Sequence, residues 1–410
     1  MRTQEQAPRY RWVILLVNFL FLTFAYAGLS AWSIAVPQLA KTFSLTQTQT
    51  QLGACALMAG YAVGSYVEAL LAARIGAKKT GLLAAALLLA PQFSIPHVES
   101  YSLIVFLRFI QGWGIVWFVT VAMTTAWFPL KERGLASGVI GGGIPAGIGI
   151  GGILSAWLLE RAGNNWQQAF TQFGCLVLAV VVVWVILARD APAGLYARAK
   201  EEAGEKEPGA RVNPFTLAAG WLIALALFVN AFQLVGFTSI LPNYMYGLAY
   251  DASQAGTAVL LCGLVGVLST PLGGIISDSL AAKGMSPIKA RAYVMAIPGF
   301  LVTAAATVAF PHIAQNGYGP LLFMVVLVGW GVPLTNASIG ALPMDMLKDP
   351  NVAGKLFGMT ILIGLMGAVA APFAAASVSE SAGWTAAFTL LGAAAFAGVI
   401  LGLIIPRFQK

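Results

Sequence analysis

The chain has 410 residues, of which 59% are hydrophobic and only 9% are charged, with a formal net charge of +8 and a mean hydropathy of +0.82. Soluble domains carry about 25% charged residues, because their surfaces face water. The composition therefore excludes an ordinary soluble protein and indicates an integral membrane protein. The basic residues are scattered through short loops, which argues against a nucleic-acid partner. Two histidines and three distant cysteines predict no metal site, cofactor or disulfide framework.

Twelve apolar segments follow one another along the chain. The opening residues, MRTQEQAPRYRW, lead directly into the first of them without a small-residue cleavage site, so we interpret them as its flank rather than as a signal peptide. A span needs about 20 apolar residues to cross the hydrocarbon layer. This rule predicts an all-α protein with twelve transmembrane helices. They cover residues 12–37, 50–73, 80–97, 101–127, 134–159, 166–188, 214–241, 253–280, 290–311, 318–343, 353–378 and 384–405.

A polar tract at 189–213, containing ARAKEEAGEKEPGAR, divides these spans into two groups of six. We interpret it as a cytoplasmic linker between an N-terminal six-helix bundle, residues 1–188, and a C-terminal one, residues 214–410. The motif W-x-x-A-F opens the sixth span at Trp166 and the twelfth at Trp384. Its recurrence at matching places favours two pseudo-symmetric halves that arose by internal duplication. A shared preference of aromatic residues for the membrane interface is the alternative.

The positions of the basic residues indicate the orientation. If both termini are inside, all 23 lysine and arginine residues except Lys41, Arg108 and Arg161 flank spans on the cytoplasmic side. The positive-inside rule therefore predicts that both termini are cytoplasmic. We therefore expect a multi-pass protein of the cell membrane, and we assign it to the bacterial inner membrane. We expect it to be a monomer surrounded by lipid.

Two kinds of motif carry a family resemblance. The segment RFIQGWG at 108–114 matches the R-x-x-Q-G-x-G pattern of the major facilitator superfamily, and the chain resembles these secondary transporters over essentially its whole length. The resemblance implies two six-helix bundles and transport by alternating access. WFPLKERGLASG at 127–138 and LPNY at 241–244 are similar to loops of organic-anion carriers. They imply a small organic anion, a mono- or dicarboxylate, as substrate.

The loop ARIGAKK at 73–79, which contains Arg74, resembles the superfamily signature G-x-x-x-D-R-x-G-x-[RK]. Ala69 and Ala73 stand where the family has Gly and Asp, whereas the second-half segment GIISD at 274–278 keeps both. In the family this Asp helps to latch the halves together. The resemblance implies that Asp278 takes that gating role here and leaves the first-half latch in doubt.

Arg108 is a charge within a predicted span, where charged residues are rare and normally face the protein interior or a water-filled cavity. Gln111 lies three residues further on, on the same helix face. A guanidinium beside an amide can bind a carboxylate, with the guanidinium making two parallel hydrogen bonds. The alternatives are that Arg108 braces neighbouring helices through backbone carbonyls or takes part in proton coupling.

Glu68 is the other unusual charge, near the inner end of the second span. We consider two roles for it: a carboxylate that carries the coupled proton, or a rim carboxylate that pairs with Arg74.

Several polar side chains can face a central cavity between the halves, where such folds bind substrate. Each also has an ordinary interpretation as a hydrogen bond between helices or as an interfacial aromatic residue. The candidates are Asn18, Tyr26, Tyr61, Trp117, Thr120, Asn230, Gln233, Asn243, Tyr244, Trp330, Thr335 and Asn336.

The fifth span is rich in glycine between Gly141 and Gly152. Small residues let helices approach closely, so we predict tight packing there. Proton-driven exporters carry a Gly-Pro pair in this span, and here Ile144 precedes Pro145.

These observations leave three hypotheses for the function of the protein. The first is a proton-coupled symporter of a small organic anion, favoured by Arg108 and by the lack of acidic residues deep in the expected cavity. The second is an exporter of lipophilic or drug-like compounds, and the third is a non-transporting sensor or assembly factor on the same scaffold. No pairing of a nucleophile with a base indicates an enzyme.

Overall fold

The computed structural model describes residues 9–129, 132–192, 195, 213, 216–347 and 350–408. Within these residues all regular structure is helical, and twelve helical spans are long and apolar enough to cross a membrane. The predicted fold class is thereby confirmed. Of the predicted linker, only residues 189–192, 195 and 213 are described, so most of it lies outside the described part of the chain.

The first six spans are built from the following helices: α1 Arg11–Phe43, α2 Gln47–Ile75, α3 Ala77–Ser94 with the short η1 Ile95–His97, α4 Tyr101–Gly112, α5 Trp117–Trp127, α6 Arg133–Gly141, α7 Gly143–Arg161 and α8 Trp166–Leu187. The second six are built from α10 Ala218–Gly247, α11 Ala252–Ala282, α12 Pro287–Val294, η4 Met295–Leu301, α13 Val302–Ala314, α14 Tyr318–Met346, α15 Pro350–Ala382, α16 Trp384–Ile404 and η5 Ile405–Phe408.

Three predicted spans are interrupted. The fourth is divided into α4 and α5 by the turn at 113–116, where a Cβ atom added to Gly114 would lie 2.6 Å from the carbonyl oxygen of Ala84. The fifth is divided at Gly142, and the ninth contains a π-helical segment around Pro298. Glycine permits a close approach of backbones, and proline removes one helical hydrogen bond, so each break has a local cause.

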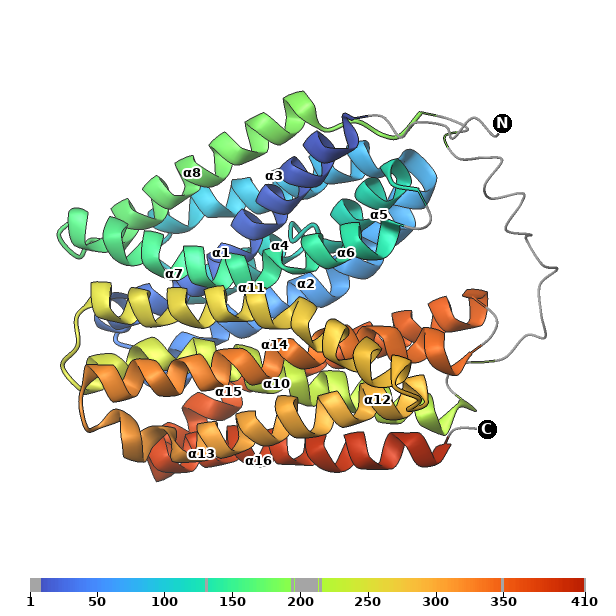
Figure 1. Cartoon of the computed structure of the whole chain (residues 1–410). Coiled ribbons are helices and arrows are strands. Elements are labelled where there is room, and N and C mark those ends of the chain that lie inside the picture. The colour runs from blue at the N-terminus through green and yellow to red at the C-terminus, as the bar shows by residue number, and fades with distance from the viewer. Residues whose placement is uncertain are drawn as a thin grey trace.

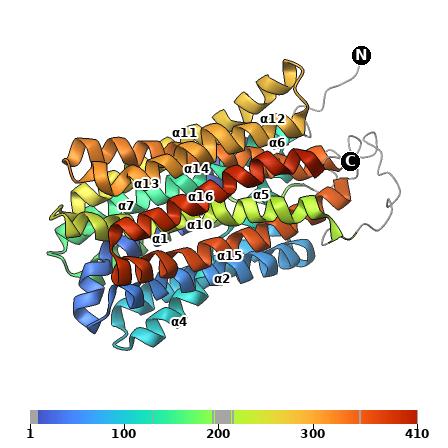
Figure 2. The same cartoon turned by 90° about the horizontal axis from the view of Figure 1, so that it is seen from below.

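The two halves repeat one arrangement. In the first half α1 packs along α7 and α2 along α4; in the second, α10 packs along α15 and α11 along α14. The halves meet where α7 crosses α11 and where α2 crosses α15 (Figures 1 and 2). α1 begins and α16 ends at the same end of the bundle, which we call the terminus end (Figure 1). The opposite end is called the far end.

Glycine residues make the crossing of α7 and α11 very close. A Cβ atom on Gly263 would lie 2.4 Å from the carbonyl oxygen of Pro145, and one on Gly149 would lie 3.0 Å from that of Leu260. Gly151 of α7 faces the other way, onto the backbone of α1. The glycine-rich span therefore packs against helices on both of its sides, which confirms the predicted tight packing.

The starts of α2 and α11 at the far end are equivalent. Thr46 caps α2 and Asp251 caps α11, and each forms a reciprocal capping box with a glutamine, Gln49 or Gln254, three residues later. The same sequence pattern thus begins the second helix of each half.

Each of these helix starts also receives a carboxylate from the other half. The backbone N–H of Thr48 in α2 donates to Glu380 at the end of α15, at 3.2 Å, and the Thr48 hydroxyl donates to the same oxygen. The backbone N–H of Ser253 in α11 donates to Glu160 at the end of α7, at 2.8 Å. Helix N-termini favour negative charge. Two symmetry-related carboxylate contacts, the far-end latches, therefore join the halves.

Replacing Gly263 by alanine is expected to lower the melting temperature of the purified protein in detergent. The new Cβ atom collides with backbone rather than with a flexible side chain, and overpacking of this kind costs about 1–3 kcal/mol. Gly319→Ala is the matched control, because a Cβ atom there meets nothing within 4 Å. Equal melting temperatures for Gly263→Ala and the control would contradict the close crossing.

Removing both latches by Glu160→Ala and Glu380→Ala is expected to open the far end more often. The reporter is a cysteine at Ser33, a buried position two helical turns beyond Tyr26 on α1, in a background without native cysteines. Its rate of labelling by a maleimide should rise several-fold. Glu99→Ala, which removes an exposed charge near the far end of the first half, is the control. An unchanged rate in the double variant would show that the latches do not hold this end closed.

Candidate functional site

A central cavity of about 200 Å³ lies between the halves. Its wall combines residues of α1, α2, α5, α6 and α7 with residues of α10, α11, α14 and α15. Towards the far end the halves touch again, because the Tyr246 hydroxyl of α10 donates to the carbonyl oxygen of Ile34 in α1 at 3.0 Å. The cavity therefore lies on the terminus side of a closed far end.

The structure brings part of the predicted site together at this cavity. Tyr26, Tyr61 and Trp117 line it from the first half, and Asn230 and Asn336 line it from the second. Phe357 of α15 also lines it and was not predicted, because hydropathy alone does not distinguish a cavity-facing phenylalanine from a lipid-facing one. None of the described lining residues is charged.

The polar groups of this cavity wall are partly used within the protein. The Asn230 side-chain N–H₂ donates to the carbonyl oxygen of Val332 at 3.0 Å and to the Thr335 hydroxyl at 2.6 Å. The rings of Tyr26 and Tyr61 meet edge to face, 6.0 Å apart. Both hydrogens of the Asn230 amide are therefore occupied, and its carbonyl oxygen is the group that it has left for a ligand.

Arg108 does not line the central cavity. It is fully buried, and its guanidinium donates to the carbonyl oxygens of Gly53 in α2, at 3.2 Å, and Gly28 in α1, at 3.3 Å. It also donates to the Gln111 side chain at 2.8 Å and lies 4.8 Å from the ring centre of Trp32. These contacts join three helices. A direct contact between Arg108 and the substrate stays a prediction. For this contact to form, the guanidinium must give up its hydrogen bonds to the carbonyl oxygens of Gly53 and Gly28 and donate to the ligand instead.

Gln111 extends this network across the first half. Its N–H₂ donates to Gln92 of α3 at 2.6 Å, and Gln92 donates to the carbonyl oxygen of Phe170 in α8 at 2.9 Å. Gln92 was missed by the sequence analysis, although an amide within the apolar run LLLAPQFS is a signal of an interhelical hydrogen bond. We call Arg108, Gln111 and Gln92 the first-half polar network.

Two further predicted residues also lie away from the cavity wall. Gln233 is buried and donates to the Thr307 hydroxyl at 2.8 Å, which joins α10 to α13. Trp330 is half-buried on α14. Neither residue lines the central cavity, and their contact with substrate stays a prediction.

Glu68 is 4% exposed, and neither of its carboxylate oxygens has a hydrogen-bond partner among the described residues. Arg74, its expected partner in one interpretation, is exposed and forms no ion pair with it within the described chain. Glu68 lies seven residues after Tyr61, so both face the same side of α2. An unpaired buried carboxylate therefore lies two helical turns from the cavity wall, towards the terminus end.

Asp278 belongs to a cluster of charges at the terminus end of the second half. It pairs with Arg291 at 2.7 Å, and Arg291 also pairs with Asp345 at 3.2 Å. All three lie in the second half, so the predicted latch between halves stays a prediction. In the first half, Asp190 accepts a hydrogen bond from the backbone N–H of Lys78 at the start of α3, at 3.0 Å. This carboxylate, which no sequence motif marks, lies beside the loop that lacks the family's Asp.

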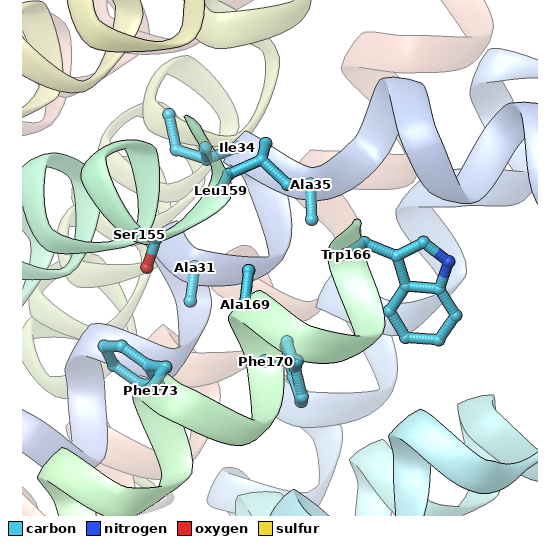
Figure 3. Close-up of a pocket in the computed structure, with 9 residues that line it drawn as sticks. All are labelled: Ala31, Ile34, Ala35, Ser155, Leu159, Trp166, Ala169, Phe170 and Phe173. Carbon is cyan, nitrogen blue, oxygen red and sulfur yellow. The ribbon is translucent and has the colours of Figure 1, made fainter. Parts of the chain in front are cut away.

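A much smaller pocket, of about 10 Å³, lies within the first half between α1, α7 and α8 (Figure 3). Its wall is apolar except for Ser155, and Phe173 and Trp166 lie at opposite ends of the group of lining residues (Figure 3). A cavity of this volume holds about one water molecule. It is therefore not a substrate site.

The known proteins to which this chain is similar include transporters of organic anions and a solved transporter structure. A hexuronate transporter of Bacillus subtilis is 24% identical over 97% of this chain and 94% of its own length. A probable sulfoacetate transporter of Cupriavidus necator is 24% identical over 98% of this chain and 95% of its own length. The fold resembles that of a bacterial homolog of the human lysosomal transporter Spinster in an inward-facing, unoccupied conformation, with a TM-score of 0.71, 15% identity and coverage of 98% and 96%.

The sequence profile described as Major Facilitator Superfamily matches residues 19–313, well over half of the chain. Together with the transporter relatives, this match indicates a multi-pass membrane transporter rather than an enzyme. The chain belongs to the Major Facilitator Superfamily.

Proposed function

We propose that the protein is a proton-coupled carrier of a small organic anion that works by alternating access. In this proposal it is a monomer in the bacterial inner membrane, both termini are cytoplasmic, and the halves at 1–188 and 214–410 move as bodies joined by the linker at 189–213. The far end is then the outer face of the membrane, and the structure is in an inward-facing state with its far-end latches closed.

The observation that carries the proposal is the cavity between the halves, which has no charged residue in its described wall. The described wall offers no carboxylate to pair with a cation and no lysine or arginine to pair with an anion, so recognition of a charged ligand there relies on hydrogen bonds. Hydroxyl, indole and amide groups can instead donate hydrogen bonds to an anion. The relatives named above carry hexuronate and, as a probable assignment, sulfoacetate, which are both organic anions.

Glu68 is proposed as the proton carrier. An ionised carboxylate without a partner is costly to bury, so in this arrangement the side chain is held as the neutral acid. A rearrangement of α2 that admits water lets it release the proton. Because Tyr61 connects the same helix face to the cavity, substrate binding and proton release can be linked through α2.

Gating is proposed to alternate between the two ends. When the far-end latches open, the terminus ends approach, and Asp278 and Arg74 then come within reach of the opposite half. Arg108 and Gln111 hold the first half rigid during this movement, through the first-half polar network.

Export of lipophilic compounds is the second candidate, since most of the residues that line the cavity are apolar or aromatic. The two functions differ in their substrates: an anion carrier discriminates against neutral molecules of the same shape, whereas an exporter of lipophilic compounds accepts them.

The test uses proteoliposomes with glucuronate, sulfoacetate and benzoate as labelled probes. We expect an imposed proton gradient to drive accumulation of at least one of them. Glu68→Gln should retain exchange of that anion across the membrane but lose the proton-driven accumulation, because the amide cannot carry a proton. Glu99→Gln is the control.

Normal accumulation by Glu68→Gln would rule out this residue as the proton carrier. Transport of neutral lipophilic compounds together with no transport of any anion would overturn the proposed function in favour of export.

A further inference from the structure

We propose that the central cavity recognises an aromatic monocarboxylate, a flat ring bearing a single carboxylate, in preference to a sugar acid or a dicarboxylate. This inference rests on the proposed function and narrows its substrate class. It follows from which groups line the cavity and from which of their hydrogen bonds are already made.

The cavity wall offers aromatic faces on both sides. Tyr26, Tyr61 and Trp117 come from three helices of the first half, and Phe357 comes from α15 of the second. Aromatic rings pack favourably edge to face or offset against one another, and Tyr26 and Tyr61 already meet edge to face. An apolar cavity of about 150 Å³ is enough for a benzene molecule. The volume of about 200 Å³ therefore accommodates one substituted ring.

The polar groups suit one carboxylate. The Tyr61 hydroxyl and the Trp117 indole N–H lie on the first-half side, and the indole nitrogen has no partner among the described residues. The indole N–H can only donate a hydrogen bond, so it can bind a carboxylate oxygen but cannot accept from a ligand hydroxyl group. On the second-half side, Asn230 has only its carbonyl oxygen free, which can accept from a hydroxyl group on the ring, and Asn336 contributes a second amide.

A sugar acid fits this wall poorly. It carries a hydroxyl group on most of its carbon atoms, whereas the remaining described lining is aliphatic side chains and glycine apart from Thr270 and Asn336, and the Thr270 hydroxyl already donates to the carbonyl oxygen of Gly266. Ligand hydroxyls that leave water without finding partners weaken binding. A second carboxylate would be worse still, because no lysine, arginine or histidine lies in the described wall to neutralise it.

Four matched probes test the inference on the purified full-length protein by thermal shift and by titration. Benzoate carries the ring and the charge, cyclohexanecarboxylate the charge without the flat ring, benzamide the ring without the charge, and glucuronate the charge on a sugar. We expect benzoate to bind at least about tenfold more tightly than each of the others, a ratio that corresponds to about 1.4 kcal/mol.

The outcomes separate this inference from the proposed function. Tighter binding of glucuronate or cyclohexanecarboxylate than of benzoate overturns the aromatic class and leaves an organic-anion carrier. Equal binding of benzamide and benzoate overturns anion recognition. Binding of none of the three anions counts against both the inference and the function.

Two substitutions locate the recognition in this cavity. Trp117→Phe keeps a ring and removes the N–H, so benzoate should lose several-fold more affinity than benzamide. Phe357→Leu removes a ring, so the preference for benzoate over cyclohexanecarboxylate should shrink. Phe323→Leu, on the exposed surface of α14, is the control. Unchanged benzoate binding in both cavity variants would place the ligand elsewhere and overturn the assignment.

Discussion

The crossing of α7 and α11 is the contact on which the two-half arrangement depends. Inside a bilayer, helices gain no hydrophobic free energy by meeting each other, so their association relies on close packing. At Gly149 and Gly263 the backbones touch with no side chain interposed. Such a contact holds the halves together without interlocking side chains. In the proposed alternating-access movement, one half can therefore roll on the other, so that opening one end of the bundle closes the other end, with the cavity in between.

Rolling of this kind requires each half to satisfy its own polar groups, because no water is present to replace a lost hydrogen bond. In the first half, the network from Arg108 to Gln92 joins five helices through carbonyls and amides of that half alone. In the second half, Asn230 and Gln233 join α10 to α14 and α13. Among the described residues, the hydrogen bonds between the halves lie instead towards the far end, at Glu160, Glu380 and Tyr246.

The sequence predicts the twelve spans and their pairing into halves well, because hydrocarbon imposes an apolar length on every span. It predicts the site less completely. A buried charge such as Arg108 must face the protein interior, but hydropathy does not say whether that interior is the cavity or the space between helices of one half. Glu160 and Glu380 were missed because carboxylates at helix ends look like ordinary solvated residues. The capping sequences at Thr46 and Asp251 match each other, and this repeat was the signal in the sequence that the two helix starts are equivalent.

The central claim is that the two halves rock about the α7–α11 crossing, and distances between pairs of spin labels test it most directly. One pair, Lys41→Cys with Asn316→Cys, spans the far end, and another, Lys79→Cys with Lys283→Cys, spans the terminus end, in a background without native cysteines. These four positions are exposed. When the latches are removed by Glu160→Ala and Glu380→Ala, the far-end distance should lengthen while the terminus-end distance shortens. Two distances that change in the same direction, or a change at one end only, would contradict the account.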